Sequence, residues 1–471
     1  MGGAAGAGAR AGVDADVDRG LELNGAPLPG GVALEDFDTG VLDEPDALAF
    51  PADFADEFDV ARAVISGLGI AAPTGLGVEE YWQATLEGRS AIGLPTRFDV
   101  SAYPAKLAAE IPEFVARERV PGRLIRQTDR ATQLGLVATG EALADAGLDL
   151  DRLPEFDVGV VTAASAGGIE FGQRELGHLW SKGKQFVSAY QSFAWFFAAT
   201  AGQISIRHAT RGPSGVLVTE QSGGIDALGQ ARRVVRKGTP VVISGSVDGG
   251  LCPWGWMGQL ATGRLSTSVD PARAFRPFAA DADGYVPGEG GAIVVVEDAE
   301  SAQARGLGRG YGEIVGYAAT FDPGPKSLER ARLAGRPAPL PGLRRAAELA
   351  LCDAGLRPEQ VDVVFADAAG VPELDRIEAF MLRDLFGPYG VPVTAPKTMT
   401  GRLIGGGASL DVATALLALR DGVIPPTVNV GEPASEYELD LVTEARHRSL
   451  HTALVLARGY GGFNSALVVR S

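Results

Sequence analysis

Apolar runs bounded by glycine-rich turns recur along the chain and predict buried strands. The first is expected at residues 61–71, where Ala, Val, Ile and Leu dominate. Further on, two segments repeat the order helix, loop, strand. In each, a glycine within an Asp-Ala-Gly-Leu motif closes the helix, at residues 145–148 and 353–356, and an apolar strand follows, at residues 156–161 and 361–365.

A second pair of similar segments follows the first pair in the same order. Helices are predicted at residues 225–238 and 410–422, each with Asp in its first turn and basic residues close to a terminal glycine, an order that suits the helix dipole. The second helix is the more apolar, and we expect it to be the more buried. Apolar strands are expected afterwards at residues 240–247 and 452–458.

Two matched pairs in the same order predict a duplicated α/β domain. The N-terminal half is expected over residues 61–310 and the C-terminal half over residues 311–471. The boundary near residue 310 lies between two predicted strands, at residues 291–297 and 312–316. Chance similarity between alanine-rich helices is the alternative explanation.

The first 60 residues differ in composition from the rest. They hold 14 acidic residues against two arginines, a net charge of −12 out of −17 for the chain, and are rich in Gly, Ala and Pro. Such a segment is expected to be a disordered acidic leader. Residues 53–59, which alternate Asp and Glu with Phe, could be a weak docking motif, or the whole leader could be an unstructured extension.

Composition also narrows the classes of function. A hydrophobic content of 46% is enough for one large or two medium cores. The negative net charge argues against a nucleic-acid partner. No apolar run is long enough for a membrane span, and the amino terminus lacks the pattern of a secretory signal. Two cysteines and four scattered histidines give no disulfide framework and no metal site, so a cytoplasmic protein without metal or cofactor is expected.

The stretch of residues 216–233 reads as a strand, a tight turn and a helix, with Gln221 in the turn. In many α/β enzymes such a turn presents a nucleophile, because the helix amino terminus offers free N–H groups and a positive dipole end. An amide has no ionisable proton and cannot be acylated as a thiolate can. The chain therefore has the framework of a covalent catalyst without its nucleophile.

Several long motifs resemble the condensing enzymes of the thiolase fold. More narrowly, the chain from about residue 61 onward is similar to the chain-length factor, or ketosynthase-beta subunit, of type II aromatic polyketide synthases. This resemblance implies an α/β thiolase fold with duplicated halves in a five-layer αβαβα arrangement. The motifs that carry it lie at residues 64–73, 96–99, 193–196, 202–208, 253–256, 284–291 and 459–465.

The resemblance also assigns four positions of the degenerate active site. The family's catalytic Cys corresponds to Gln221, its two His to Ala369 and Arg402, and its active-site lysine to Lys397. Gln is no nucleophile, Ala exchanges no protons and Arg stays protonated. Because loss of one member of a cooperating set commonly costs orders of magnitude, this chain alone is not expected to condense acyl groups.

The function that the resemblance implies is that of a non-elongating partner. Family members pair with a Cys-bearing ketosynthase-alpha subunit and accept chains from an acyl carrier protein through phosphopantetheine. A tunnel then limits chain length, and the family's gating helix corresponds to residues 166–177. Its tunnel-facing positions would be Ile169, Gly172 and Leu176, none of them aromatic. We therefore expect a roomy tunnel and a long product, decaketide to dodecaketide; an ordinary core helix is the alternative.

A different function remains open for Gln221. Its N–H could stabilise the enolate formed when malonyl-carrier protein loses carbon dioxide, which would make the chain a decarboxylating, priming subunit, with Arg402 supplying positive charge. Gln221 could equally fill a buried slot with its hydrogen bonds satisfied by backbone. A third reading, acyl transfer by Cys252 or Cys352, lacks a thiolate-stabilising neighbour in the sequence, and Cys352 is expected to be buried in a helix.

Three further features have structural interpretations. Glycines 405–407 precede a predicted helix and could cradle a phosphate, although close backbone packing is favoured. Residues 288–291 resemble a family turn and are expected to shape the pocket. The aromatic segment of residues 193–197 fits a subunit interface, with plain core as the alternative.

Overall fold

The computed structural model describes residues 61–112, 114–308, 310–323 and 341–471. The predicted leader, with its candidate docking motif at residues 53–59, lies outside the described residues. Within the described part of the chain, no helix is long and apolar enough to cross a lipid bilayer.

One mixed sheet forms the centre of the fold, and its strand order repeats itself. The order is β13-β11-β10-β15-β16-β9-β1-β8-β7-β5-β6, with β2 (Gly75–Leu76) paired to β1. From the central β1/β9 pair outward, each side has two antiparallel pairings followed by two parallel ones, and the C-terminal side has one further parallel pairing, between β11 and β13. The duplication expected from the sequence is therefore present in the topology.

The two sides of the sheet use equivalent strands. On the N-terminal side these are β1 (Ala63–Ala72), β8 (Gly290–Asp298), β7 (Val241–Asp248), β5 (Val158–Ala163) and the edge strand β6 (Ser214–Leu217). On the C-terminal side they are β9 (Gly312–Phe321), β16 (Phe463–Arg470), β15 (Thr452–Arg458), β10 (Val363–Phe365) and β11 (Pro392–Thr394), with β13 (Asp440–Leu441) added beyond β11.

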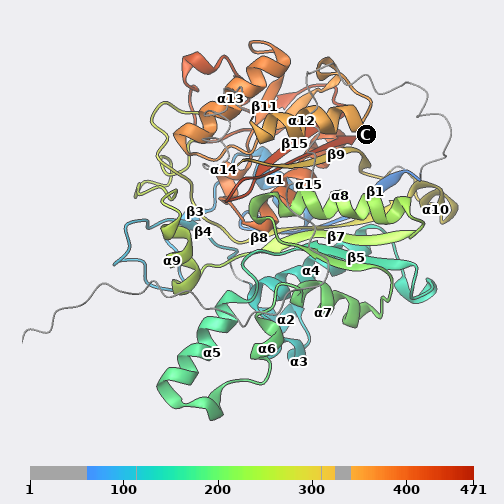
Figure 1. Cartoon of the computed structure of the whole chain (residues 1–471), viewed down its shortest axis with the longest axis vertical. Coiled ribbons are helices and arrows are strands. Elements are labelled where there is room, and N and C mark those ends of the chain that lie inside the picture. The colour runs from blue at the N-terminus through green and yellow to red at the C-terminus, as the bar shows by residue number, and fades with distance from the viewer. Residues whose placement is uncertain (1–60, 113, 309, 324–340) are drawn as a thin grey trace, which may run out of the picture. The chain divides into compact units, whose positions relative to one another are not determined.

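Helices pack between the two sides of the sheet and on their outer faces (Figure 1). The five layers are therefore outer helices, the N-terminal side of the sheet, central helices, the C-terminal side of the sheet and a second set of outer helices. The helices α8 (Gly223–Arg236) and α15 (Gly405–Asp421) pack against each other and contact strands of both sides of the sheet. On the outer face of the N-terminal side lie α4 (Arg130–Asp145) and α7 (Ala199–His208), and α12 (Gly342–Asp353) covers the C-terminal side with α13 (Pro372–Phe386) beside it. This five-layer arrangement confirms the predicted thiolase fold class.

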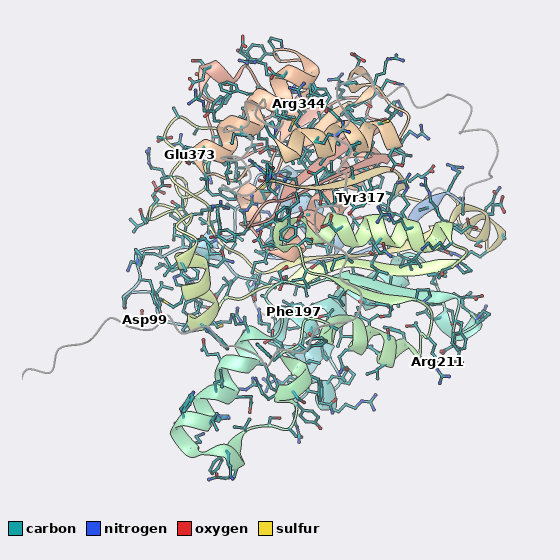
Figure 2. The ribbon with its side chains drawn as sticks, viewed as in Figure 1. Asp99, Phe197, Arg211, Tyr317, Arg344 and Glu373 are labelled. Carbon is teal, nitrogen blue, oxygen red and sulfur yellow. The ribbon has the colours of Figure 1, made fainter. Side chains whose placement is uncertain are left out.

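The central helices are buried because small residues let them approach closely. In α15 the first fifteen residues are all buried, which confirms the expectation that it is the more buried of the two repeated helices. At the contact between the helices, a Cβ on Gly224 would stand 2.4 Å from the backbone nitrogen of Ser409, so no larger residue fits there. Figure 2 shows Tyr317 of β9 beside α8, where its ring covers Gly229.

The remaining elements are short or lie outside these layers. The helices α5 (Ile169–Lys182), α6 (Gln191–Ala194) and α9 (Pro253–Ala261) group together beyond the sheet. Smaller elements connect the layers: α1 (Val78–Leu86), β3 (Ile92–Gly93), β4 (Ala108–Ala109), α2 (Ala116–Arg119), α3 (Gly122–Ile125), α10 (Ala299–Ala304), α14 (Lys397–Thr400), β12 (Val423–Ile424), β14 (Arg446–His447) and the 3₁₀ helices η2 (Leu150–Arg152), η3 (Lys184–Phe186), η4 (Glu220–Ser222), η5 (Pro358–Gln360) and η6 (Ser435–Tyr437).

Candidate functional site

A cavity of about 460 Å³ lies where η4, the loop after β10, the start of α15 and the turn between β15 and β16 converge. Three of the candidate site positions from the sequence, Ile169, Ala369 and Arg402, line it. Gln221 does not, but it follows the lining residue Glu220 and its amide contacts the backbone of Ile404, which also lines the cavity. Among the described residues that line the cavity there is no cysteine and no histidine. The polar and charged side chains in the wall are Ser165, Glu220, Gln259, Thr262, Arg264, Tyr285, Asp322, Asp367, Arg402, Arg458, Tyr460 and Asn464.

Gln221 is buried, with 6% of its surface exposed, and its amide is tied to one backbone unit. In the amide orientation that satisfies both ends, the nitrogen donates to the Ile404 carbonyl (3.1 Å) and the oxygen accepts from the Ile404 N–H (3.2 Å). Ile404 has a left-handed φ of 53°, which is strained for a β-branched residue. The contacts favour the interpretation that Gln221 fills a buried slot and holds the strained backbone at the start of α15.

The three glycines 405–407 form the first turn of α15, which corrects the expectation that they form a loop before the helix. Each of them has a close neighbour where a side chain would be. A Cβ on Gly405 would meet the Asp248 carboxylate at 3.0 Å, one on Gly406 the Gly290 carbonyl oxygen at 1.8 Å, and one on Gly407 the Gln221 amide at 2.7 Å. Close packing, and not a phosphate cradle, explains the triplet.

The loop after β10 carries Ala369 and is held from below by α13. The Glu378 carboxylate accepts from the backbone N–H groups of Asp367 (2.8 Å) and Ala368 (3.0 Å), and the Asp375 carboxylate accepts from that of Gly370 (3.0 Å). Burial raises the pKa of Asp375 to about 7. Ala369 itself is buried and offers the cavity only a methyl group, so no proton transfer can occur there.

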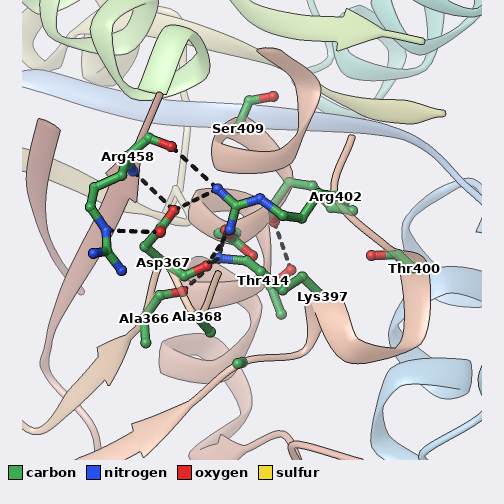
Figure 3. Close-up of polar contacts among 12 residues, drawn as sticks. Ala366, Asp367, Ala368, Lys397, Thr400, Arg402, Ser409, Thr414 and Arg458 are labelled. Carbon is green, nitrogen blue, oxygen red and sulfur yellow. Dashed lines mark hydrogen bonds and ion pairs between the residues drawn. The ribbon is translucent and has the colours of Figure 1, made fainter. Parts of the chain in front are cut away.

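Arg402 is committed to its own protein neighbours. Its guanidinium donates to the carbonyl and to the carboxylate Oδ1 of Asp367, both at 2.9 Å, and to the Arg458 carbonyl at 3.2 Å. Arg458 approaches the same carboxylate from the other side, with Nε donating to Oδ2 at 3.0 Å. Figure 3 shows both arginines converging on Asp367. Their charges hold the pKa of Asp367 well below its usual range, and those of Asp367 and Glu220 raise the pKa of Arg402.

Lys397 is buried at the start of α14. It belongs to the same polar cluster as Asp367, Arg402 and Arg458, which we call the Asp367 cluster. Its ammonium forms an ion pair with Asp411 of α15 at 2.8 Å and donates to the carbonyl oxygens of Ala366 and Asp367. It does not line the cavity. The structure therefore gathers Gln221, Ala369, Arg402 and Lys397 into one region, with the three polar side chains engaged by neighbouring protein groups.

Glu220 is one of several charged cavity residues that the sequence analysis did not single out. It precedes Gln221 with a left-handed φ of 54°, and its carboxylate accepts from the Tyr460 N–H at 2.9 Å. Burial raises its pKa, and the positive charge of Arg402 opposes that shift. No sequence motif marks this glutamate as a cavity residue, because the direction of its side chain depends on the left-handed backbone conformation of the turn. When ionised, it places a negative charge in the cavity wall.

The three predicted gate positions on α5 separate in the structure. Ile169 lines the cavity, Gly172 is buried beneath two tryptophans, and Leu176 is half-buried further along the helix. A Cβ on Gly172 would stand 3.0 Å from Cδ1 of Trp195 and 3.4 Å from Cζ3 of Trp254. The space left by the missing side chain is therefore filled by indole rings from other segments, so Gly172 by itself does not indicate a roomy tunnel.

The two cysteines lie apart from this chemistry. Cys252 is buried at the amino terminus of α9, where burial raises the pKa of its thiol. Cys352 is exposed on α12, which corrects the expectation of a buried thiol. Neither lines the cavity. A raised pKa keeps Cys252 in its unreactive thiol form, so the structure offers no support for cysteine-based acyl transfer.

The aromatic segment of residues 193–197 lies on the surface rather than in the core. Phe193, Trp195, Phe196 and Phe197 are exposed, and Figure 2 labels Phe197 beyond the sheet. Nearby on α5, α9 and η3, further large apolar side chains are exposed, namely Trp180, Phe186, Trp254 and Met257. Large exposed apolar patches mark interaction sites, so the exposure of these side chains favours the interface interpretation over the core alternative.

The turn at residues 288–291 contributes to the wall of the cavity, as expected. Pro287 and Gly288 line it. The next residue, Glu289, is buried behind it, where its carboxylate accepts from Arg97 and Arg130, each at 2.9 Å. Arg97 also forms an ion pair with Glu170 of α5 at 2.9 Å, which links this turn to the predicted gating helix.

Comparison with known proteins gives one consistent family. Residues 61–302 match the family model for the β-ketoacyl synthase N-terminal domain, and residues 311–431 match the model for its C-terminal domain. The actinorhodin polyketide putative β-ketoacyl synthase 2 of Streptomyces coelicolor is 57% identical over 86% of this chain and 98% of its own length. The tetracenomycin polyketide synthase ketoacyl synthase beta subunit of Streptomyces glaucescens is 56% identical over 87% and 98%.

Solved structures agree with these sequence relatives. A chain of the ishigamide ketosynthase/chain length factor superposes with a TM-score of 0.77 at 26% identity, covering 87% of this chain and 99% of that one. A chain of a type II polyketide synthase ketosynthase, solved in complex with its acyl-carrier protein, superposes with a TM-score of 0.76 at 24% identity over 87% and 99%. The second likeness concerns the fold alone.

Proposed function

Because the chain belongs to the β-ketoacyl synthase family, and because curated relatives more than half identical to it are polyketide β-ketoacyl synthase 2 and beta subunits, we propose that it is a ketosynthase-beta subunit, or chain-length factor. In this role it pairs with a Cys-bearing ketosynthase-alpha subunit, does not elongate chains itself, and sets the length of the poly-β-ketone in aromatic polyketide biosynthesis.

One observation carries this proposal: the cavity at the family's active-site position contains neither a cysteine nucleophile nor a histidine base among its described lining residues. We propose that Gln221 stands in the Cys position, Ala369 and Arg402 stand in the two His positions, and Lys397 retains the lysine position. A thioester cannot form on an amide, and a guanidinium held by Asp367 cannot exchange protons near neutral pH. Catalysis must then come from the partner.

The exposed aromatic segment and a free sheet edge support a heterodimer. Phe193, Trp195, Phe196 and Phe197 project from one region of the surface, and β6 is hydrogen-bonded to a neighbour, β5, along one edge within the described residues. An apolar patch with an open strand edge is suited to burial against a second subunit of the same fold. We propose the alpha subunit as that partner.

Substrate delivery in this proposal comes from an acyl carrier protein, whose phosphopantetheine arm carries malonyl and polyketide groups to the partner's nucleophile. The growing chain then extends along α5, where Ile169, Gly172 and Leu176 are proposed as the gate. A bulky side chain in a close-packed wall stops further growth. A long product, decaketide to dodecaketide, remains a prediction, and a cytoplasmic location suits the two free cysteines.

The geometry does not favour the alternative of malonyl decarboxylation by Gln221. The Gln221 amide is engaged at both ends by Ile404, and Arg402 is engaged by Asp367 and Arg458. In addition, an ionised Glu220 would repel the malonyl carboxylate. We therefore propose no second function for the cavity.

Co-expression with a Cys-bearing alpha subunit tests the proposal. We expect the two chains to co-purify and to give one main poly-β-ketone, identified by mass spectrometry. The purified chain alone, mixed with acyl- and malonyl-carrier protein, should form no β-keto thioester. Condensation by the isolated chain, or an unchanged product when this chain is replaced by a relative of different product length, would contradict the proposal.

A further inference from the structure

We propose that Asp129 and Asp248 are positioning residues for chain-length control: two buried carboxylates that hold the first turn of α5 and thereby set the place of Ile169 in the cavity wall. This inference rests on the proposed function of α5 as the gate. The two aspartates come from different elements, Asp129 from the residue before α4 and Asp248 from the last residue of β7.

The amino terminus of α5 has no cap of its own. The residue before the helix is Gly168, which has no side chain to accept the free N–H groups of the first turn. The helix packs mainly against the small elements η3, α6 and α9, which lie beyond the sheet. Its position must therefore be fixed by contacts other than burial against the central layers.

Asp248 holds the turn that leads into α5. Its Oδ2 accepts from the backbone N–H groups of Ser165 (2.7 Å) and Ala166 (3.2 Å). The same carboxylate accepts from the N–H of Gly405 at 3.3 Å, at the start of α15. Asp248 is 1% exposed, so these bonds are shielded from water. Asp248 therefore fixes the turn before α5 relative to the amino terminus of α15, which Gln221 also holds.

Asp129 holds α5 on the other side of Ile169. Its Oδ1 accepts from the N–H of Ala131 and so caps α4 (3.0 Å), while its Oδ2 accepts from the N–H of Phe171 in the first turn of α5 (2.8 Å). Asp129 is 4% exposed. One carboxylate thus caps two helices, and it links the gate to α4, which packs on the sheet.

Ile169 lies between these two anchors along the chain. It is three residues after Ala166 and two before Phe171, and its Cγ2 lies against Gly250, two residues after Asp248, where a Cβ would be 3.5 Å away. A charged acceptor bonded to backbone N–H groups is stronger and more directional than a neutral one. Loss of either carboxylate should therefore let the first turn of α5 shift and leave the wall at Ile169 poorly defined.

Two substitutions test this inference in the heterodimer with the alpha subunit. Asp129→Ser keeps a hydroxyl cap for α4 but is too short to reach Phe171, and Asp248→Asn places an N–H donor among backbone donors. We expect the share of products one two-carbon unit longer or shorter than the main product to rise about tenfold, a loss of about 1.4 kcal/mol of discrimination. The matched control is Asp362→Asn, because Asp362 also accepts two backbone N–H groups, from His451 and Thr452, but lies far from α5 in the C-terminal half.

The outcomes separate this inference from the proposed function. Product ratios are measured by mass spectrometry and heterodimer assembly by gel filtration, so a lower yield with unchanged ratios would overturn the inference. Failure of both variants to assemble would also overturn it, since the aspartates would then serve folding alone. Ile169→Phe provides the second arm: if it changes product length while the aspartate variants do not, the gate stands and the positioning role is wrong. If Ile169→Phe changes nothing, the gate itself is wrong.

Discussion

The indole of Trp195 lies against the backbone of Gly172, so closely that a Cβ on the glycine would stand 3.0 Å from the ring. Gly172 lies in α5, whereas Trp195 lies at the carboxyl end of α6. Glycine at this position accommodates a tryptophan rather than opening a void. The width of any passage along α5 therefore depends on the indole as much as on the helix.

Replacement of Trp195 by Ala should lengthen the product made with the alpha subunit, because it removes a large ring from above Gly172. We expect the main product to grow by at least one two-carbon unit, measured by mass spectrometry. Trp180→Ala is the matched control, since Trp180 is on α5 but 83% exposed. A heterodimer that assembles normally and keeps its product length would contradict this prediction.

The opposite change, Gly172→Trp, should shorten the main product. A third indole cannot share the space with Trp195 and Trp254, so it must turn along the helix toward the cavity side. Gly177→Trp serves as a control, because Gly177 is on the same helix, is exposed and has open space around it. The assignment of Gly172 to the gate fails if the Gly172→Trp heterodimer gives the parent's product distribution.

Replacement of Gln221 by Ala should leave malonyl-carrier-protein decarboxylation by the heterodimer unchanged and lower stability. The buried Ile404 N–H would lose its bond to Gln221 and the Ile404 carbonyl would keep only its bond from the Gly407 N–H, at a cost of about 1–3 kcal/mol, measured as a shift in the urea midpoint. Gln221→Glu should be at least as destabilising, because a carboxylate cannot donate to the Ile404 carbonyl. A fall in decarboxylation of tenfold or more with Gln221→Ala would restore the catalytic interpretation.

Arg402 should be required for stability. Removal of the guanidinium in Arg402→Met leaves the Asp367 carboxylate with one arginine and removes one hydrogen-bond donor from each of the buried carbonyl oxygens of Asp367 and Arg458. We expect a loss of about 3 kcal/mol in urea denaturation. Arg357→Met, whose side chain is 79% exposed, should change stability by less than about 0.5 kcal/mol. Equal effects of the two substitutions would show that the Asp367 cluster contributes little.

Asp375 should make stability fall as the pH rises toward 8. In the folded protein, burial raises the pKa of the Asp375 carboxyl to about 7; the negative charge of Glu378 adds to this shift and the positive charge of Arg458 opposes it. In the unfolded chain the pKa of the same carboxyl is about 4. Protonation of Asp375 therefore makes its full contribution to the free energy of unfolding below about pH 4, and this contribution is lost as the pH rises through 7. Asp375→Asn lacks this titration. The difference in melting temperature between parent and variant heterodimers should change between pH 5.5 and pH 8, and a constant difference would contradict the assignment.

The correct part of the sequence prediction concerned features that neighbouring residues specify. Apolar runs and glycine-closed helices placed β1, β5, β7, α8 and α15, and the order of the repeats predicted the duplicated sheet. Helix periodicity and composition are local properties, so they can be read without knowledge of the fold. The greater burial of α15 followed for the same reason, since most of its residues are apolar or glycine.

By itself the sequence determined that this chain has a duplicated α/β framework, with an amide, Gln221, in a strand-turn-helix segment of the kind that presents a nucleophile in many α/β enzymes. Only the tertiary structure decided that the amide of Gln221 is occupied by Ile404, that Glu220 lines the cavity, and that Trp195 covers Gly172. It also placed Cys352 on the surface and glycines 405–407 inside a helix. The physical reason is that these relationships join residues distant in the chain, and the packing of whole layers, rather than any local propensity, brings them into contact.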